Sequence, residues 1–378
     1  MRTPLHQAAR RFPLVARRRP PCRPLDERIQ EIIDLARTSS EATDAADGLA
    51  AAAAAQNRAA LIASDCGMPE LAASLCRQHY ELYMEARPLT AQTARYALEP
   101  LINLSRLLIR AGDPETACSQ LEELYLAVRT RDSARIGGLA LPIGDLICSG
   151  REHRDLCQWL WGVMLADGVR ALATSGRWKR AALFAQQHHG VGRRLLDGRQ
   201  AMIVAQALTG KPESAMASVE QSATPEAWEE AVAACLAMLC RRAAGDPPSD
   251  TETAAVDDYL ALEQSPELAT FRVRIALTAI GPSGGEDLDD SGPIVSRIAR
   301  EIPRVEDGYV ARDLLQAPEL KGKLTEAQQV QLLLTVKTAG LGQESIPDPL
   351  RVELLKAAEE SRCAAADLLQ NHLASQTL

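Results

Sequence analysis

The chain has 378 residues, enough for two ordinary domains or one extended repeat array with a sizeable core. Alanine and leucine are abundant and only 3% of residues are aromatic, a composition that favours closely packed helices over sheets. Seven Arg and no Asp or Glu lie in residues 1–24, so the formal charge of −8 conceals an acidic body, and we do not expect direct nucleic-acid binding by phosphate contacts.

The sequence contains no run of about 18 apolar residues, which argues against a transmembrane helix and a membrane location. Its nine cysteines are odd in number and scattered, without a C-x-x-C pair. This usage predicts free, mostly buried thiols in a reducing, cytoplasmic environment. Sets such as Cys66, Cys76 and His79 match no closed zinc pattern, so no structural metal is expected.

Residues 1–24 begin the chain with a Pro- and Arg-rich composition and no apolar periodicity. We expect this segment to be a disordered leader, because such a composition cannot bury a continuous face. Its prolines interrupt any apolar stretch, so it is not a convincing signal peptide. An alternative is that its arginines contact nucleic acid or an acidic partner.

Apolar residues then recur at helical spacing over most of the chain. The expected helices in the first half cover residues 25–37, 50–66, 69–85, 101–111, 117–128 and 156–176. Residues 131–150 hold five Gly or Pro and few periodic apolar positions, which predicts a long loop. A further helical pair is expected over 251–280, and a long helix over 350–373.

A six-residue pattern recurs four times where one expected helix gives way to the next. Its copies begin at Gly67, Gly112, Gly176 and Gly210. The Gly suits a helix C-cap because it enters the left-handed region without steric cost. Where Pro follows two residues later, it suits the first turn of the next helix. An Ala five residues after the Gly allows the second helix to lie close against the first.

The last two copies are 34 residues apart, and a degenerate copy at Gly245 follows 35 residues later. With the glycine-to-alanine elbow, this period resembles tetratricopeptide repeats over about residues 40–245. The earlier copies are 45 and 64 residues apart, so those repeats carry insertions, and a related irregular α-solenoid fits nearly as well. We therefore expect an all-α fold: an irregular, tetratricopeptide-like solenoid of helical hairpins with a smaller C-terminal helical domain.

The expected domain organisation follows from these elements. The repeat domain covers residues 25–280, and the Gly- and Asp-rich residues 281–292 read as a flexible acidic linker. The C-terminal helical domain covers residues 293–378, where no internal repeat is evident. Some bacterial regulators join such repeats to an N-terminal helix-turn-helix module. Residues 1–24 leave no room for one, so any regulatory role would act through a partner.

The resemblance implies a concave binding groove lined by the first helix of each hairpin. Polar residues counted back from the elbow glycines are Asn57, Arg58, Asn103, Arg106, Arg110, Asp167, Arg170, Asp197 and Gln200. Asn103, Arg106 and Arg110 lie at i, i+3 and i+7, which places them on one helix face. Members of the family grip a peptide's terminal carboxylate with Asn and Lys or Arg, a task that suits guanidinium groups. The alternative is an ordinary solvated helix face.

Residues 188–199 form a second unusual stretch, rich in His, Gly and Arg. Its basic residues are His188, His189, Arg193, Arg194 and Arg199. One interpretation is a pocket for an anion near a helix N-terminus. The other is a turn between repeats with solvated arginines, and the stretch does not match a phosphate-binding loop.

No catalytic signature or cofactor motif is evident, and we expect neither a catalytic residue nor a cofactor. The sequence favours a non-catalytic adaptor or regulatory partner that binds a protein or peptide segment, possibly one bearing a carboxylate, in a concave groove. An enzyme or ligand sensor with an anionic-metabolite pocket near residues 188–199 is the alternative. Fold class alone does not decide between them.

Overall fold

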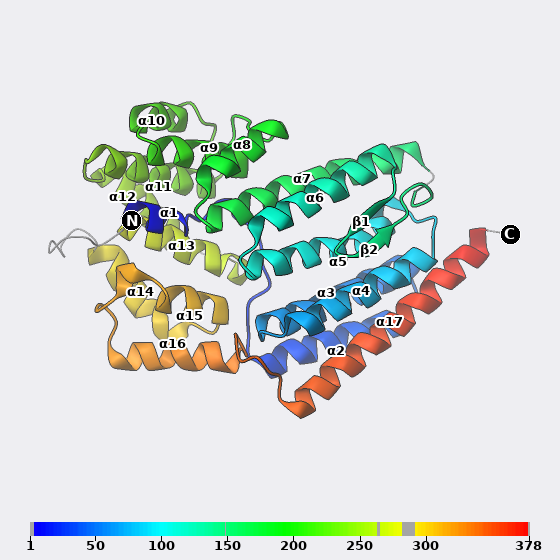
Figure 1. Ribbon diagram of the computed structural model, residues 1–378. Coiled ribbons are helices and arrows are strands. Elements are labelled where there is room, and N and C mark those ends of the chain that lie inside the picture. The colour runs from blue at the N-terminus through cyan, green and yellow to red at the C-terminus, as the bar shows by residue number, and fades with distance from the viewer. Residues whose placement is uncertain (1–3, 148, 263–264, 282–291, 377–378) are drawn as a thin grey trace. The chain divides into compact units, whose positions relative to one another are not determined.

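The computed structural model describes residues 4–147, 149–262, 265–281 and 292–376 (Figure 1). These residues are mostly helical, which confirms the expected all-α class. The strands in this part of the chain, β1 (Ala134–Ile136) and β2 (Leu139–Leu141), form a short antiparallel hairpin. The sequence predicted only a loop here. Gly137 and Gly138, at φ +57° and +86°, form the two-residue turn, because this turn type requires left-handed backbone at both positions.

The chain folds into two compact units, each built from two segments. Unit 1 comprises Met1–Arg23 and Leu165–Ala339, and unit 2 comprises Pro24–Met164 and Gly340–Leu378. This division differs from the expected one, because the residues assigned to a separate C-terminal domain are shared between both units. Of the expected acidic linker at 281–292, residues 282–291 lie outside the described residues.

Unit 2 is an assembly of long helices. They are α2 (Leu25–Glu41), α3 (Ala45–Asp65), α4 (Pro69–Glu85), α5 (Ala91–Arg110), α6 (Pro114–Thr130), the first part of α7 (Gly150–Thr174) and α17 (Asp348–Gln376). The last helix, α17, lies along α2 and α3 (Figure 1). It buries Leu354 and Ala365 on one face, and α2 buries Ile29 and Ile32. This shared apolar surface is why α17 belongs to unit 2.

Unit 1 contains the remaining described helices, most of which are shorter. They are α1 (Pro4–Ala9), the rest of α7, α8 (Trp178–Gln187), α9 (Asp197–Leu208), α10 (Pro212–Glu220), α11 (Ala227–Ala244), α12 (Asp250–Ala261), α13 (Ala269–Ile280), α14 (Gly292–Glu301), α15 (Gly308–Leu315) and α16 (Glu326–Thr338). Three 3₁₀ turns link some of them: η1 (Pro266–Leu268), η2 (Ile302–Arg304) and η3 (Pro318–Leu320).

The recurring elbow has the expected geometry at all four positions. All four elbow glycines have left-handed backbone, with φ between +78° and +84°: Gly67, Gly112, Gly176 and Gly210. Helices α4, α6 and α10 begin with Pro in the first turn. The alanines five residues after each Gly are buried: Ala72, Ala117, Ala181 and Ala215. The sequence therefore predicted the boundary and the close packing at each elbow.

The N-terminal segment is structured, so the expectation of a disordered leader is wrong for its described residues. After α1, residues 10–23, which we call the strap, run without regular structure against the helices of unit 1. Phe12, Leu14 and Cys22 are buried, and the Phe12 ring meets Trp178 edge to face with centroids 6.4 Å apart. An irregular segment needs no periodic pattern to bury isolated side chains, which is why periodicity did not reveal it.

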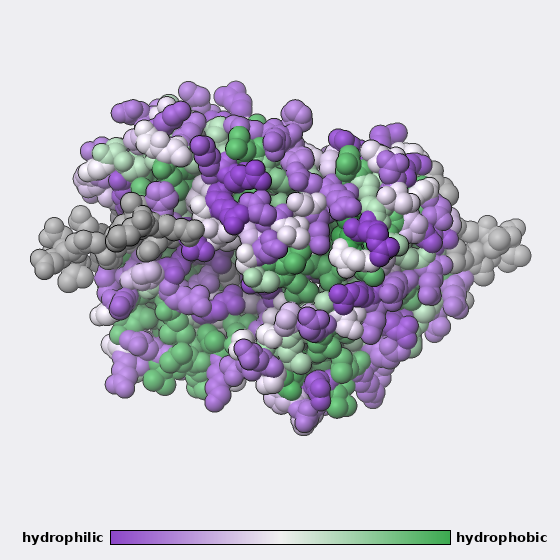
Figure 2. All heavy atoms as spheres, in the orientation of Figure 1, coloured by the Kyte–Doolittle hydropathy of each residue, from purple (hydrophilic) through white to green (hydrophobic). Residues whose placement is uncertain are grey.

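Apolar side chains also remain exposed on unit 1. Val330, Leu333 and Leu334 on α16 are each more than half exposed. Figure 2 shows hydrophobic side chains at the surface in the region where α16 lies in Figure 1. Their i, i+3, i+4 spacing makes a short apolar stripe that faces solvent. Among the described helices, none combines the length and apolar character needed to cross a bilayer.

Candidate functional site

Polar side chains form a continuous row along α3 and α5 of unit 2. Asn103 donates from Nδ2 to Oδ1 of Asn57 (2.9 Å), and Asn57 donates from Nδ2 to the Glu99 carboxylate (2.5 Å). Arg106 donates to Oδ1 of Asn103 (2.9 Å). We call Asn57, Glu99, Asn103 and Arg106 the ridge. Its hydrogen bonds connect the first helices of two successive hairpins.

Arg58 of α3 and Arg110 of α5 form two ion pairs, one with α2 and one with α3. Arg58 pairs with Glu31 at 2.8 Å, and Arg110 pairs with Asp65 at 3.0 Å. Asp65 and Arg110 each lie two residues before an elbow glycine, so they occupy equivalent levels of successive hairpins. Each of the five residues that the sequence predicted in this half of the groove therefore has a side-chain partner on α2, α3 or α5. The Asp65 carboxylate also forms an ion pair with the buried Arg28, at 2.5 Å.

Glu99 is the acidic residue of the ridge, and it was not among the residues predicted from the sequence. Burial raises the pKa of its carboxyl, while the hydrogen bond from Asn57 and the charges of Arg106 and Arg95 lower it. Arg95 lies over the ring of Trp159, with its guanidinium carbon 5.6 Å from the ring centroid. Glu99 lies four residues before Asn103 and four after Arg95 in α5, so helical spacing from either residue could have found it.

The other predicted groove residues lie in unit 1, and two of them contact a residue of the strap. Arg17 contacts Asp167 of α7 at 3.4 Å and Asp197 of α9 at 2.5 Å. Burial lowers the pKa of Arg170 to about 10, against the opposing effect of Asp197. The buried Gln200 donates to the Leu195 carbonyl at 2.5 Å. We call Asp167, Arg170, Asp197 and Gln200 the cradle.

The cradle carboxylates bind a guanidinium of the chain itself. They lie on α7 and at the start of α9, the first helices of the third and fourth hairpins, as expected from the elbow positions. These two carboxylates are therefore occupied by Arg17 of the strap. A position on a first helix therefore does not by itself make a residue available to a partner.

The basic stretch at residues 188–199 uses two of its arginines to connect neighbouring elements. Arg194 contacts Glu226 at 2.7 Å and the fully buried Glu229 at 3.0 Å. Arg199 donates to the hydroxyl of Ser222 and to the carbonyl of Ser218. These contacts favour the interpretation of a turn between repeats.

The remaining basic residues of this stretch differ in their surroundings. His188 packs on the Phe184 ring, with centroids 4.8 Å apart. His189 is exposed and has left-handed backbone, and Arg193 is exposed. The stretch therefore combines a ring contact, two arginine anchors and two exposed basic side chains.

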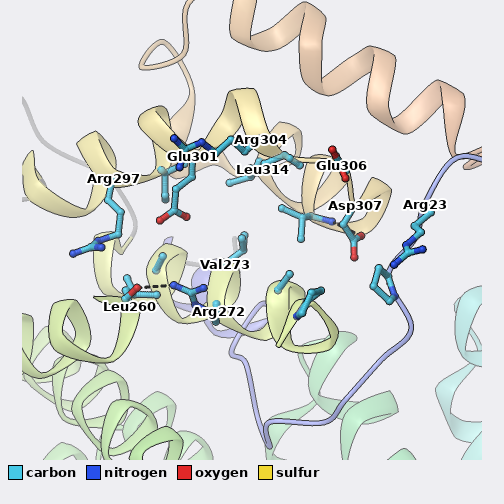
Figure 3. A pocket seen from close by; sticks show the side chains of 17 residues that line it. Arg23, Leu260, Arg272, Val273, Arg297, Glu301, Arg304, Glu306, Asp307 and Leu314 are labelled. Atoms are coloured by element: carbon cyan, nitrogen blue, oxygen red, sulfur yellow. Dashed lines mark hydrogen bonds between the residues drawn. The ribbon is translucent and has the colours of Figure 1, made fainter. Parts of the chain in front are cut away.

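A cavity of about 420 Å³ lies in unit 1 between α13 and the α14–η2–α15 segment (Figure 3). We call it the α13 cavity. Its walls are largely apolar, and Arg272 of α13 and Glu301 of α14 both line it. The sequence reading did not find this site, because its residues come from separate helices. A signal was present in α13, which carries two Arg and no acidic residue to pair with them.

Thiols and imidazoles form no recognisable metal site in the described part of the chain. The cysteines described there are free and mostly buried, while Cys148 lies outside the described residues. The Cys157 sulfur lies 3.6 Å from Nε2 of His153, which also contacts the Val128 carbonyl oxygen at 2.7 Å. Burial lowers the pKa of His79 to about 3, so this imidazole is neutral in the folded state near neutral pH.

Comparison with known proteins finds no matching family model, no matching curated protein and no matching solved structure. The ridge, the cradle and the α13 cavity are therefore assigned roles from their own geometry and chemistry.

Proposed function

We propose that this protein is a non-catalytic adaptor or regulatory partner of the cytoplasm, and that it binds an extended peptide segment along the ridge. In this proposal, the hairpins α3–α4 and α5–α6 act as units of an irregular, tetratricopeptide-like solenoid. The observation that carries the proposal is the hydrogen-bonded row from Asn57 through Asn103 to Arg106, which joins two successive first helices.

The ridge offers the chemistry that an extended peptide requires. Carboxamides such as Asn57 and Asn103 both donate and accept hydrogen bonds, so they can pair with peptide groups. The Asn57 amide is oriented by its bond to Glu99, which favours one defined presentation. Arg106 is exposed beside them and can meet a carboxylate of the peptide, either terminal or on a side chain.

The strap supports this proposal by analogy within the same chain. In unit 1, hairpin helices of the same kind contact an irregular segment through isolated buried side chains and through the Arg17 carboxylate contacts. This is a mode of contact that an extended peptide in trans could adopt on unit 2. The charges are opposite in the two units. In unit 1 the helices supply carboxylates and the segment supplies an arginine, whereas in unit 2 the exposed charge of the ridge is the guanidinium of Arg106.

An immobilised library of short random-sequence peptides tests the proposal. Each peptide is presented with a free C-terminal carboxylate and, in duplicate, as the amide. We expect the full-length protein to bind a subset of sequences, and Arg106→Gln to weaken that binding about tenfold, as loss of one charge-assisted hydrogen bond predicts.

Arg77→Gln is the matched control, because Arg77 is an exposed arginine on α4, a second helix of a hairpin. We expect this variant to bind like the parent. Equal losses in both variants would show that binding depends on general charge, and the ridge assignment would then be wrong. Absence of any sequence-dependent binding would contradict the adaptor proposal itself.

A ligand sensor is the second candidate function, and one observation favours it. The enclosed α13 cavity has the size of a small-molecule site and holds charged groups among apolar walls. This site differs from the anion pocket first considered at residues 188–199.

A further inference from the structure

We infer that the α13 cavity binds a small zwitterion with an apolar body, the chemical class of free apolar amino acids and short apolar peptides. This inference is independent of the peptide-binding ridge, because it concerns a different site in the other unit. It rests on the shape of the cavity and on two facing charges that lack ion-pair partners.

The walls of the cavity suit an apolar ligand body. Ala269, Val273 and Ala276 of α13 lie at i, i+4 and i+7, so one face of this helix forms a wall. Val310 and Leu314 of α15, one turn apart, also line the cavity. Its volume of about 420 Å³ falls within the usual range for small-molecule sites, about 300–1,000 Å³.

Arg272 supplies an uncompensated positive charge at the cavity. Its Nη2 donates to the Leu260 carbonyl oxygen at 2.5 Å (Figure 3), but Nε is buried and has no hydrogen-bond partner among the described residues. No carboxylate in the described part of the chain pairs with this guanidinium. A half-buried, unpaired cation is costly, so the site favours an anionic group.

Glu301 supplies the opposite charge from the end of α14. In Figure 3 its carboxylate points into the cavity, on the side facing Arg272. Among the described residues it makes no ion pair, with Arg272 or with any other cation. Glu301 is exposed, and a carboxylate that points into the cavity favours a cationic group on the ligand.

Two of the other charged residues that line the cavity have partners in the protein. Arg297 pairs with Asp257 at 2.8 Å, and Asp307 accepts from the backbone N–H groups of Tyr309 and Val310 at the start of α15. Arg304 and Glu306 also line the cavity and are exposed. We assign the ligand charges to Arg272, because its Nε is buried without a partner among the described residues, and to Glu301, because its carboxylate points into the cavity in Figure 3. A molecule with a carboxylate and an ammonium group satisfies both at once.

Isothermal titration calorimetry on the full-length protein tests this inference with three probes: L-leucine, L-phenylalanine and the dipeptide Leu-Leu. We expect saturable binding of at least one, and the preferred probe distinguishes a single amino acid from a short peptide. The N-acetyl and methyl ester forms of that probe each remove one charge, and we expect each to bind at least about tenfold more weakly. No saturable binding by any probe would overturn the inference.

Two substitutions then assign the charges. Glu301→Gln should abolish the preference for the free ammonium over its N-acetyl form, and Arg272→Gln should abolish the preference for the free carboxylate over its ester. Glu306→Gln and Arg304→Gln are the matched controls, since both residues line the cavity and are exposed. We expect them to retain both preferences.

Circular dichroism and melting temperature establish that each variant is folded. If Arg272→Gln fails to fold, Arg272→Lys retains the positive charge without the guanidinium fork and is expected to keep the preference for the free carboxylate. Unchanged preferences in a folded Glu301→Gln variant would contradict the inference, because they would show that Glu301 does not bind the ammonium group of the ligand.

Discussion

The cradle and the ridge occupy comparable places in their units, but their polar side chains have different binding partners. Both use polar residues on first helices of hairpins, counted back from an elbow glycine. In the cradle, Asp167 and Asp197 bind Arg17 of the strap. In the ridge, neighbouring side chains bind one another, and the Arg106 side chain remains exposed.

Because of this difference, we expect the cradle to contribute to stability and the ridge to contribute to binding, although both occupy similar positions. A buried carboxylate is tolerated only where a cation or donors compensate it, so the cradle needs the strap in order to be stable. The ridge is already satisfied internally by neutral amides and by contacts to Glu99. We therefore expect substitutions in the strap and cradle to affect folding, and those at the exposed side of the ridge to affect binding.

The largest effect is expected from removing the main anchor of the strap. Phe12→Ala should lower the free energy of unfolding of unit 1 by about 3–5 kcal/mol, because a buried ring is lost and its space is left empty. Chemical denaturation measures the loss, and hydrogen exchange shows whether it is confined to unit 1.

Leu183→Ala is the control for this substitution, since Leu183 is 46% exposed on α8 of the same unit. Its effect should be within about 0.5 kcal/mol. Equal, small effects of both substitutions would mean that the strap does not pack in solution, and the contrast between cradle and ridge would fail.

A smaller effect is expected from removing the cation of the cradle. The Arg17 side chain is 33% exposed, so Arg17→Met should cost about 1–2 kcal/mol, less than the about 3–5 kcal/mol typical of breaking a fully buried pair. Arg106→Met on the ridge should change stability by less than about 0.5 kcal/mol. Thermal and chemical denaturation of the two variants test the comparison directly, and a larger loss for Arg106→Met would reverse it.

The smallest effect concerns the pH dependence of the ridge. Because burial raises the pKa of Glu99, its contribution to stability is fully present below the pKa of the unfolded chain and is lost as the pH rises through the folded value. Glu99→Gln stays neutral, so it should be more stable than the parent at pH 7, by about 1 kcal/mol or less, with no gain near pH 4. Urea denaturation across this range measures it, and a constant difference between the proteins would show that ionisation of Glu99 is not the cause.

Local chemistry made part of this architecture readable from the sequence. The elbows follow from Gly, Pro and Ala at short, fixed spacings, and the relation of Asn103 to Arg106 follows from the period of one helix. The contact between Asn57 and Asn103 required only that successive first helices lie side by side, which the resemblance to a repeat family implied.

Contacts between segments far apart in the chain could not be predicted from such local patterns. Arg17 and Asp197 are far apart in the chain, and no local pattern relates them. The same holds for α17 beside α2, and for Arg272 facing Glu301 across the α13 cavity. Residues 10–23 lack apolar periodicity because their structure is irregular, and this lack of periodicity does not exclude packing.

The interleaving of the two units has a consequence for synthesis on the ribosome. Unit 2 begins at Pro24, yet α17, which lies against α2 and α3, is translated only after all of unit 1. Until then the surfaces of α2 and α3 that contact α17 lack their final cover. We expect the nascent chain to complete unit 1 first and to remain a substrate for chaperones until α17 emerges. Released chains truncated after residue 339 should therefore be protease-resistant in unit 1 and sensitive in unit 2.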